Sequence, residues 1–371
     1  MLKGLRMITF LVRKLQGMST ARYVFMSHFG TLLTSSDEGL LYHAFPEEIK
    51  PNIIANSHGH IVDAPEFIKD KLSATSVTEG FFSVSSVKGY LCADIGGAIG
   101  WRPHCLDLER FRLLSWDEYN YRRQIDPVNF NENIRKYSIS RIIHQTHDED
   151  IIPEHFLPGV ERLRAYNPSW EYIYWNEKDR LDFIYQYYGW KVLKAYLSIN
   201  PRYGAARADL FRYLCIYKLG GIYLDLKSTT NISFDDLVHP EDQYLLSQWR
   251  NGQGESSEGC GLGPEVACVK GGEFQQWHIA AAAGHPFLKN VIHNTLTRIR
   301  LYSEDYFGGG KLSVLRVTGP YVYTMSIYPN LQKYPHRFFD AEKDGLVYSF
   351  VGDHTKLFTK HYSRETTPLI L

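Results

Sequence analysis

The feature that most constrains the fold is a long apolar helix that stops at two glycines and leads directly into a short strand. Residues 203–219 repeat apolar side chains at helical spacing, and Gly220 and Gly221 follow them. Glycine commonly ends helices because it adopts the required backbone conformation without steric cost. Residues 222–224, Ile-Tyr-Leu, are too short and too apolar to be anything except a buried strand. The sequence therefore predicts an α/β sheet in this region.

Three charged residues in the same run predict a binding site. Asp209 and Arg212 are three positions apart and share one face of the predicted helix. Asp225 directly follows the strand, and ligands of open α/β sheets bind outside the carboxyl ends of the strands. We therefore expect Asp225 where a polar substrate would lie. The alternative for Asp209 and Arg212 is a salt bridge on the helix surface.

The run resembles the signature of glycosyltransferase family 32, in which an Asp and an Arg on a helix precede a Gly-Gly-aromatic strand and an Asp-x-Asp motif. This family includes inositol-phosphoceramide mannosyltransferases and many bacterial surface-polysaccharide enzymes. Further segments resemble motifs of the family in the right order: residues 139–146, 152–154, 167–172 with Trp175, 318–320 and 361–362. Separated motifs in order are more specific than a single motif. The resemblance covers residues 138–365 and implies a GT-A domain, a Rossmann-like fold that binds a nucleotide sugar.

The resemblance also implies an activity and a set of donor contacts. The activity is a retaining transfer of a hexose from a nucleotide sugar, GDP-mannose or a UDP-hexose, to a glycan, glycolipid or polysaccharide acceptor. Asp209 and Arg212 correspond to the clamp on the donor sugar, and Asp225 to the first aspartate of the motif. Donor contacts are further implied at His144, Gln145, Thr318, Gly319 and His361. No Asp or Glu nucleophile is identifiable, which favours a front-face displacement assisted by the leaving diphosphate.

A Gly-rich stretch over residues 252–272 predicts a long loop. Long loops in compact domains tend to carry function, so we expect acceptor binding beside it. The acceptor-binding candidates flank the loop on both sides: Trp249, Gln276, Trp277 and His278.

Lys227 departs from the family pattern, which has an aspartate at this position. An ammonium cannot ligate a cation, although it supplies a positive charge itself. Either Lys227 binds the donor diphosphate directly, or Mn²⁺ or Mg²⁺ is held by Asp225, phosphate oxygens and His361. A third interpretation leaves Lys227 in solvent beyond the strand. The predicted catalytic residues are Asp209, Arg212, Asp225 and Lys227, with metal dependence left open.

The sequence pattern before residue 138 is typical of a smaller all-β module. Residues 24–40 and 84–98 each read as strand, turn and strand, and residues 109–114 add another strand. This pattern resembles the β-trefoil units of fascin-like domains, which implies either carbohydrate binding or a packing role. We predict a leader over residues 1–19, the all-β module over 20–120, a connector over 121–137 and the GT-A domain over 138–371.

Composition excludes several classes of partner. Lys and Arg balance Asp and Glu at 41 each, so no global field attracts nucleic acid. The five scattered cysteines favour reduced thiols in a cytoplasmic protein and argue against a zinc site. No stretch approaches 18 apolar residues, so we expect no transmembrane helix. An apolar run at residues 7–12, between basic residues, allows at most peripheral contact with the inner face of a membrane.

Two other functions stay open at this point. Lys227 favours a catalytically impaired carbohydrate-binding protein that uses the trefoil-like module, whereas intact Asp209, Arg212 and Asp225 count against it. The same layout of charged residues also resembles the clostridial glucosylating toxins, which implies a toxin-like protein glycosyltransferase as the second alternative.

Overall fold

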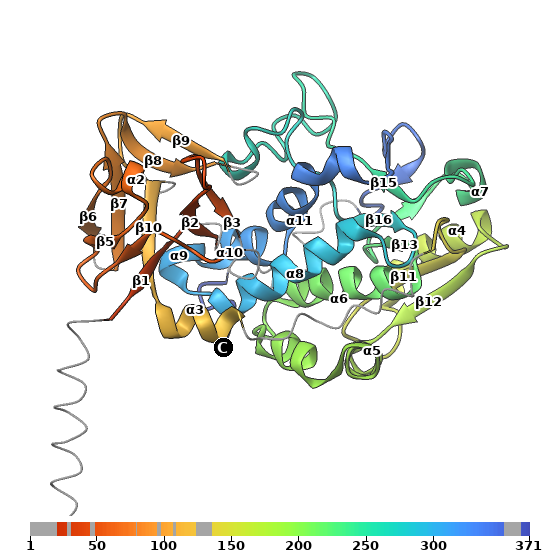
Figure 1. Cartoon of the computed structure of the whole chain (residues 1–371). Coiled ribbons are helices and arrows are strands. Elements are labelled where there is room, and N and C mark those ends of the chain that lie inside the picture. The colour runs from red at the N-terminus through yellow and green to blue at the C-terminus, as the bar shows by residue number, and fades with distance from the viewer. Residues whose placement is uncertain are drawn as a thin grey trace, which may run out of the picture. The chain divides into compact units, whose positions relative to one another are not determined.

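The structure is a computed structural model that describes residues 21–27, 31–44, 49–78, 80–94, 98–106, 109–123, 136–351 and 365–371. The chain forms two compact units, residues 1–126 and 127–371, and Figure 1 gives the course of the elements. The predicted leader, most of the predicted connector and His361 lie outside the described residues. Within the described ranges, no helix combines the length and apolar character needed to cross a membrane.

The described part of the first unit contains ten strands in one sheet in which every pair is antiparallel. Its main path runs in the order β3 (Leu41–Ala44), β2 (Leu32–Ser35), β1 (Tyr23–Met26), β10 (Arg110–Ser115), β7 (Phe81–Ser86), β8 (Gly89–Ala93) and β9 (Ile99–Arg102). The other strands pair beside this path: β4 (Ile54–Ala55), β5 (Ile61–Asp63) and β6 (Ser73–Thr78). The described residues of this unit also form the helices α2 (Glu66–Lys69) and α3 (Trp116–Arg123). The prediction of an all-β module is therefore confirmed.

The sheet of the first unit nearly closes on itself, because β3 lies close to β9. The buried His43 of β3 bonds through Nε2 to the carbonyl oxygen of Asp94, at 2.5 Å, just beyond β8. Phe25 and Phe111 pack edge to face inside the sheet, with ring centroids 6.4 Å apart. A near-barrel of antiparallel strands does not establish the threefold repeat of a trefoil, so the trefoil stays a prediction.

The second unit is built on a mixed sheet with the order β12-β11-β13-β16-β15-β17. Its strands are β11 (Ile142–Thr146), β12 (Glu171–Trp175), β13 (Gly221–Leu224), β15 (Tyr244–Leu246), β16 (His278–Ala281) and β17 (Arg337–Phe338). β11 pairs in parallel with both β12 and β13, whereas β16 runs antiparallel to β13 and β15. A separate pair joins β14 (Thr229–Thr230) to β18 (Leu346–Val347).

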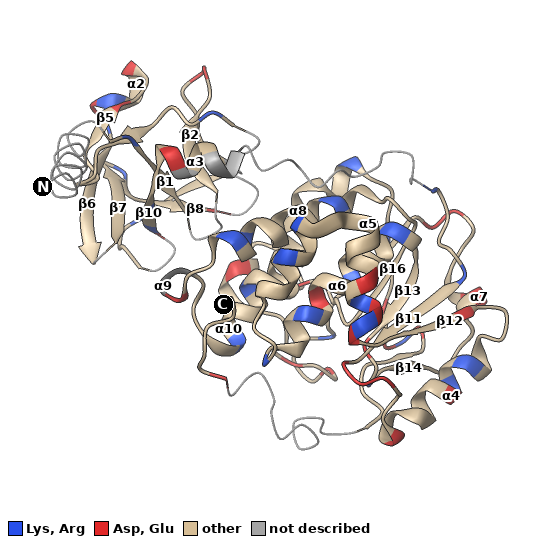
Figure 2. Cartoon of the chain, turned by 90° about the horizontal axis from the view of Figure 1, so that it is seen from below, with Lys and Arg blue, Asp and Glu red and all other residues tan. Residues whose placement is uncertain are grey.

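The helices and 3-10 turns of the second unit connect and cover these strands. In chain order they are η4 (Glu154–Phe156), α4 (Leu157–Tyr166), α5 (Glu177–Ser198), α6 (Gly204–Leu219), α7 (Phe234–Leu237), η5 (Pro264–Val266), α8 (Pro286–Leu301), α9 (Glu304–Phe307), α10 (Gly310–Val317), α11 (Pro320–Ile327) and η6 (Tyr328–Lys333). α6 packs on β13 and β16, and α8 packs on α6. Figure 2 shows basic and acidic residues interspersed in both units.

Alternation along β13 explains how helices cover both faces of the sheet. Ile222 and Leu224 are buried in one core cluster with Leu163 of α4. Tyr223, between them, points to the opposite face, where its ring lies under Arg212 of α6. The expected α/β architecture is therefore confirmed.

The predicted helix stop at Gly220 and Gly221 is also confirmed, and both residues have positive φ, 70° and 101°. A Cβ on Gly221 would lie 2.4 Å from the carbonyl oxygen of Ile142, because β11 and β13 approach closely there. Glycine is therefore required at this position both by backbone conformation and by space.

Candidate functional site

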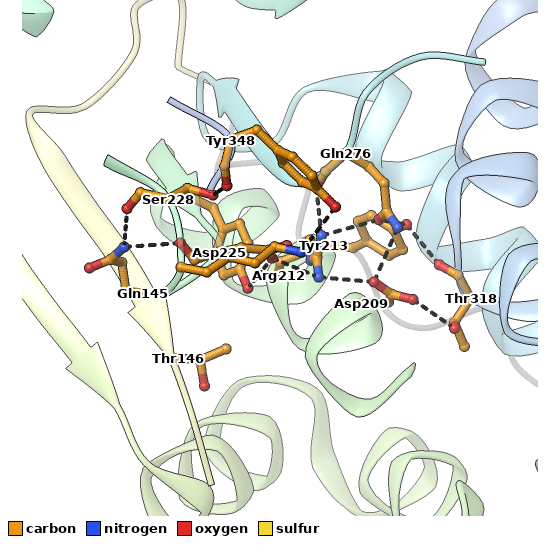
Figure 3. Close-up of polar contacts among 12 residues, drawn as sticks. Gln145, Thr146, Asp209, Arg212, Tyr213, Asp225, Ser228, Gln276, Thr318 and Tyr348 are labelled. Carbon is orange, nitrogen blue, oxygen red and sulfur yellow. Dashed lines mark hydrogen bonds and ion pairs between the residues drawn. The ribbon is translucent and has the colours of Figure 1, made fainter. Parts of the chain in front are cut away.

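Asp209 and Arg212 face the end of β13 from α6, and their side chains are only 4% and 5% exposed. Arg212 Nη2 lies 2.9 Å from Asp209 Oδ1 and 3.1 Å from Asp225 Oδ1. One guanidinium nitrogen thus joins the three residues that the sequence singled out (Figure 3). Burial excludes the alternative of a salt bridge on the helix surface.

Asp209, Arg212 and Asp225 together form what we call the clamp. Two further residues hold the clamp from elements distant in sequence. The buried Thr318 donates its hydroxyl to Asp209 Oδ2, at 2.9 Å. Gln276 donates through Nε2 to Asp209 Oδ1, at 3.2 Å, and its backbone carbonyl accepts from Arg212 Nη1, at 2.6 Å. Tyr213 donates to Gln276 Oε1 at 2.6 Å, and its hydroxyl also lies 2.7 Å from the Thr318 carbonyl oxygen. The clamp is therefore positioned by α6, by the start of β16 and by the turn before α11.

Burial sets the electrostatics of Asp209. Desolvation raises the pKa of this carboxyl to about 6, although the Arg212 guanidinium and the Thr318 hydroxyl both oppose the rise. Asp209 is therefore mostly ionised at neutral pH and gains a proton in mildly acidic solution. Arg212 also lies 4.7 Å from the ring centre of Tyr223, which provides a cation–π contact.

Asp225 is the most accessible member of the clamp, with 23% of its side chain exposed. Its Oδ1 accepts from Arg212 and, at 3.2 Å, from the hydroxyl of Tyr223. Burial raises the pKa of Tyr223, which keeps that hydroxyl protonated as a donor. Among the described residues no hydrogen bond reaches Asp225 Oδ2, so this oxygen remains available for a ligand.

Lys227 is half-buried and held by an aromatic side chain rather than extended into solvent. Its Nζ lies 3.0 Å from the hydroxyl of Tyr348 and 4.3 Å from the centre of that ring. Tyr348 follows β18, and Ser228 Oγ donates to its carbonyl oxygen at 2.6 Å. The interpretation that Lys227 merely points to solvent is therefore wrong.

Of the protein ligands that the family resemblance implies for Mn²⁺ or Mg²⁺, the described residues include one, the Asp225 carboxylate. No group of three or more His, Cys, Asp or Glu side chains suited to a metal occurs in the described ranges. Asp225 brings one carboxylate, already paired with Arg212, and the second motif position brings the ammonium of Lys227. The other predicted ligand, His361, lies outside the described residues.

His144 and Gln145 are fully buried at the end of β11, and their polar atoms bond within the protein. His144 Nε2 donates to the Gly220 carbonyl oxygen at 3.0 Å, and Nδ1 accepts from Trp175 Nε1 at 3.2 Å. Burial lowers the pKa of His144 to about 4, so the ring is neutral. In this structure neither side chain can touch a ligand, which corrects the prediction of direct donor contacts.

Gln145 instead supports the loop that carries the motif. Its Nε2 donates to the carbonyl oxygens of Asp225, at 3.1 Å, and Ser228, at 3.3 Å. Its Oε1 accepts from the Tyr172 hydroxyl at 3.0 Å. Gln145 is therefore positioned to fix the course of residues 225–228.

The four predicted acceptor residues are not equivalent in the structure. His278 is buried, its Nε2 lies 2.8 Å from Ser247 Oγ, and burial lowers its pKa to about 3. Trp277 is 4% exposed and packs against Tyr348. Gln276 bonds to Asp209 of the clamp. Of the four candidates, this leaves the half-buried Trp249 as the one with an accessible surface. Direct acceptor contacts by His278 and Trp277 are therefore corrected to packing roles in this structure.

The remaining donor candidates, Thr318 and Gly319, lie together at the start of α11. Thr318 bonds to Asp209 of the clamp, as described above. A Cβ on Gly319 would lie 2.9 Å from the Val314 carbonyl oxygen, so glycine is needed there for close backbone approach.

The sequence analysis missed three tyrosines of the site. Tyr223 and Tyr348 contact charged residues, and Tyr213 supports Gln276 and Thr318. Tyr213 lies one turn beyond Asp209, and Tyr223 alternates with the core residues of its strand, so both signals were present in the sequence. Tyr348 gave no local signal, because it is 121 residues from Lys227.

A family model matches the region of the site, and several known proteins are similar to part of the chain. The family model described as a glycosyltransferase sugar-binding region containing a DXD motif matches residues 153–244. Inositol phosphoceramide mannosyltransferase 3 of Schizosaccharomyces pombe is 31% identical over 206 residues, which cover 54% of this chain and 49% of that protein. The initiation-specific alpha-1,6-mannosyltransferase of Candida albicans is 26% identical over 228 residues, 57% of each chain. The chain thus spans about half the length of these relatives.

Among solved structures, the ligand-free glycosyltransferase domain of the YGT toxin gives a TM-score of 0.40 at 8% identity, over 61% of this chain and 84% of that one. A TM-score this low does not establish a shared fold. The family model, in contrast, spans the helix that carries Asp209 and Arg212 and the strand that Asp225 directly follows. Residues 153–244 of this chain accordingly resemble the sugar-binding region that the family model describes by its DXD motif.

Proposed function

We propose that this protein is a retaining hexosyltransferase that uses a nucleotide sugar and acts on a glycan, glycolipid or polysaccharide. The observation that carries the proposal is the buried clamp, in which one nitrogen of Arg212 bonds to both Asp209 and Asp225. Such a buried charged network is costly to a fold unless its members are mutually satisfied, and such networks concentrate at functional sites. Asp225 Oδ2, which accepts no hydrogen bond from the described residues and belongs to a side chain that is 23% exposed, is suited to accept one from a sugar or ribose hydroxyl.

In the proposed reaction, the bond between the sugar anomeric carbon and the diphosphate oxygen breaks, and a bond to the acceptor oxygen forms on the same face. The acceptor hydroxyl gives its proton to the departing diphosphate oxygen, so no protein nucleophile is consumed. The protein then contributes position and charge, because the leaving group gains negative charge as the bond breaks. Arg212 and Lys227 are the cations of the site that stabilise this charge.

The names of the fungal relatives support mannose as the first sugar to test, with a glycolipid or glycan as the acceptor. We propose that the second unit has the GT-A fold, which its α/β sheet supports. We further propose that the antiparallel first unit is a trefoil-like module that contacts the acceptor glycan.

A donor panel tests the proposal. Purified full-length protein is mixed with GDP-mannose, UDP-glucose, UDP-galactose or a UDP-N-acetylhexosamine, and binding and hydrolysis are measured with Mn²⁺ and with EDTA. We expect selective binding and slow hydrolysis of one donor, and loss of hydrolysis in Asp225→Asn.

The matched control is Asp182→Asn, an exposed carboxylate paired with Lys178 on α5, which should behave as the wild type. Wild-type hydrolysis in Asp225→Asn would refute the site. Absence of binding to every donor, together with binding to a glycan array, would favour the carbohydrate-binding alternative.

A further inference from the structure

The segment that carries Lys227 is paired along its backbone with the segment that carries Tyr348. Phe350 donates its amide to the Lys227 carbonyl oxygen at 3.1 Å, and the pairing continues into β14 and β18. The Tyr348 hydroxyl is thereby held 3.0 Å from the ammonium. On its other sides the Tyr348 ring packs edge to face against Trp249 and Trp277, at 5.1 and 5.4 Å between centroids. Contacts between segments distant in sequence therefore fix the position of the Lys227 ammonium.

The Lys227 ammonium has hydrogen-bond donors that Tyr348 does not use. A lysine ammonium carries three N–H donors, and Tyr348 accepts one of them. Within the described ranges, no carboxylate lies within ion-pair distance of Lys227, in contrast to Arg212, which pairs with two. A half-buried cation without a counter-charge is unfavourable, and a bound anion removes that cost. Lysine is well suited to this task, because it binds phosphate as a compact point charge.

The charge balance of the site opposes a divalent cation. The carboxylates of Asp209 and Asp225 and the cations of Arg212 and Lys227 sum to zero net charge, although Lys227 forms no direct ion pair with either carboxylate in the described ranges. With an aspartate in place of Lys227 the same four positions would carry a double negative charge, which is what a divalent cation neutralises. The lysine thus supplies within the chain the positive charge that the Asp-x-Asp motif obtains from a metal.

We propose that Lys227, held by Tyr348, is the subsite for the donor diphosphate, and that donor binding requires no divalent cation. The inference rests on the proposed function and deepens it by naming the group that meets the leaving diphosphate. The ligand class is a nucleoside diphosphate or its sugar ester.

Equilibrium binding of the reaction product tests this proposal without relying on turnover. UDP and GDP are titrated separately into the full chain by calorimetry, in EDTA and in Mn²⁺. We expect one of them to bind the wild type with equal affinity in both buffers. Lys227→Met should weaken binding in EDTA about ten- to a hundredfold, as expected for the loss of a charged hydrogen bond.

Three variants separate the charge from the fold. Lys227→Arg should retain binding in EDTA because it keeps the positive charge. Lys227→Asp should lose binding in EDTA and regain it in Mn²⁺, because it restores the Asp-x-Asp motif. Tyr348→Phe keeps the ring and removes the hydroxyl, so it should weaken binding less than Lys227→Met. Lys178→Met, which removes a lysine whose side chain is 79% exposed, is the control and should bind as the wild type.

Two results would overturn the inference while leaving the proposed function intact. These are wild-type binding that requires Mn²⁺, and undiminished binding by Lys227→Met in EDTA. Failure of the wild type to bind either nucleoside diphosphate in either buffer would instead refute the proposed function and the inference together.

Discussion

Substitution of Thr318 by valine tests whether Asp209 must be charged for the clamp to work. The Thr318 hydroxyl is buried and donates to Asp209 Oδ2 at 2.9 Å, and valine keeps the shape while removing this donor. A hydrogen bond to a charged group contributes about 1.5–3 kcal/mol. Because that bond favours the ionised carboxylate, its loss should raise the Asp209 pKa by about one to two units, at 1.36 kcal/mol per unit.

The expected readout is the acid limb of the pH–rate profile for donor hydrolysis. The pKa of Asp209 in the wild type is raised to about 6, so activity should fall as the pH decreases through that value and the ion pair with Arg212 loses its anion. In Thr318→Val the same fall should occur at higher pH, by about one to two units. The sign follows because protonation inactivates the clamp and the substitution makes protonation easier.

Thr295→Val is the matched control. Thr295 is also fully buried, but within the described residues its hydroxyl has no hydrogen-bond partner. We expect this variant to keep the acid limb of the wild type and to lose little stability. An acid limb that stays in place in Thr318→Val would refute the assignment of this ionisation to Asp209.

The remaining predictions concern Arg212 of the clamp, the glycine stop at Gly221 and the loop of residues 225–228 that Gln145 supports. Arg212→Met should destabilise the fold by about 3–5 kcal/mol and abolish hydrolysis, because it leaves two carboxylates uncompensated; chemical denaturation and a donor assay measure both effects, and retained activity would contradict the clamp. Gly221→Ala should prevent stable folding, since its Cβ would meet the Ile142 carbonyl oxygen at 2.4 Å; a wild-type melting temperature would contradict this, and Gly254→Ala, where φ is also positive but space is open, is the control. Gln145→Leu should cost about 1–3 kcal/mol of stability and raise the KM for the sugar donor, because the side-chain amide that bridges the carbonyl oxygens of residues 225 and 228 is lost; an unchanged KM would exclude a positioning role.

The central clamp could be predicted from sequence because its geometry is local. Asp209 and Arg212 lie one helical turn apart, and Asp225 ends the strand that immediately follows, so chain connectivity alone brings the three together. The glycine stop and the α/β order were equally local.

The contacts of His144 and Gln145 could not be predicted from local pattern. Their strand, β11, lies between β12 and β13 and is covered on both faces, so neither alternation nor polarity distinguishes residues that line a site from residues inside the core. Tyr348 and Gln276 reach the site through pairings distant in sequence, which composition and spacing do not encode.

The shared nitrogen of Arg212 limits which substitutions the site tolerates. Because Asp209 and Asp225 bond to the same atom, removal of either changes what the other contributes, and their effects should be strongly non-additive. Loss of Arg212 would leave both carboxylates without a counter-charge and would destabilise the fold. The three residues therefore form one coupled unit, and substitution of any one of them should impair the other two. Lys227 does not take part in these ion pairs. Substitution of Lys227 can therefore change the charge of the site while the Asp209, Arg212 and Asp225 contacts remain.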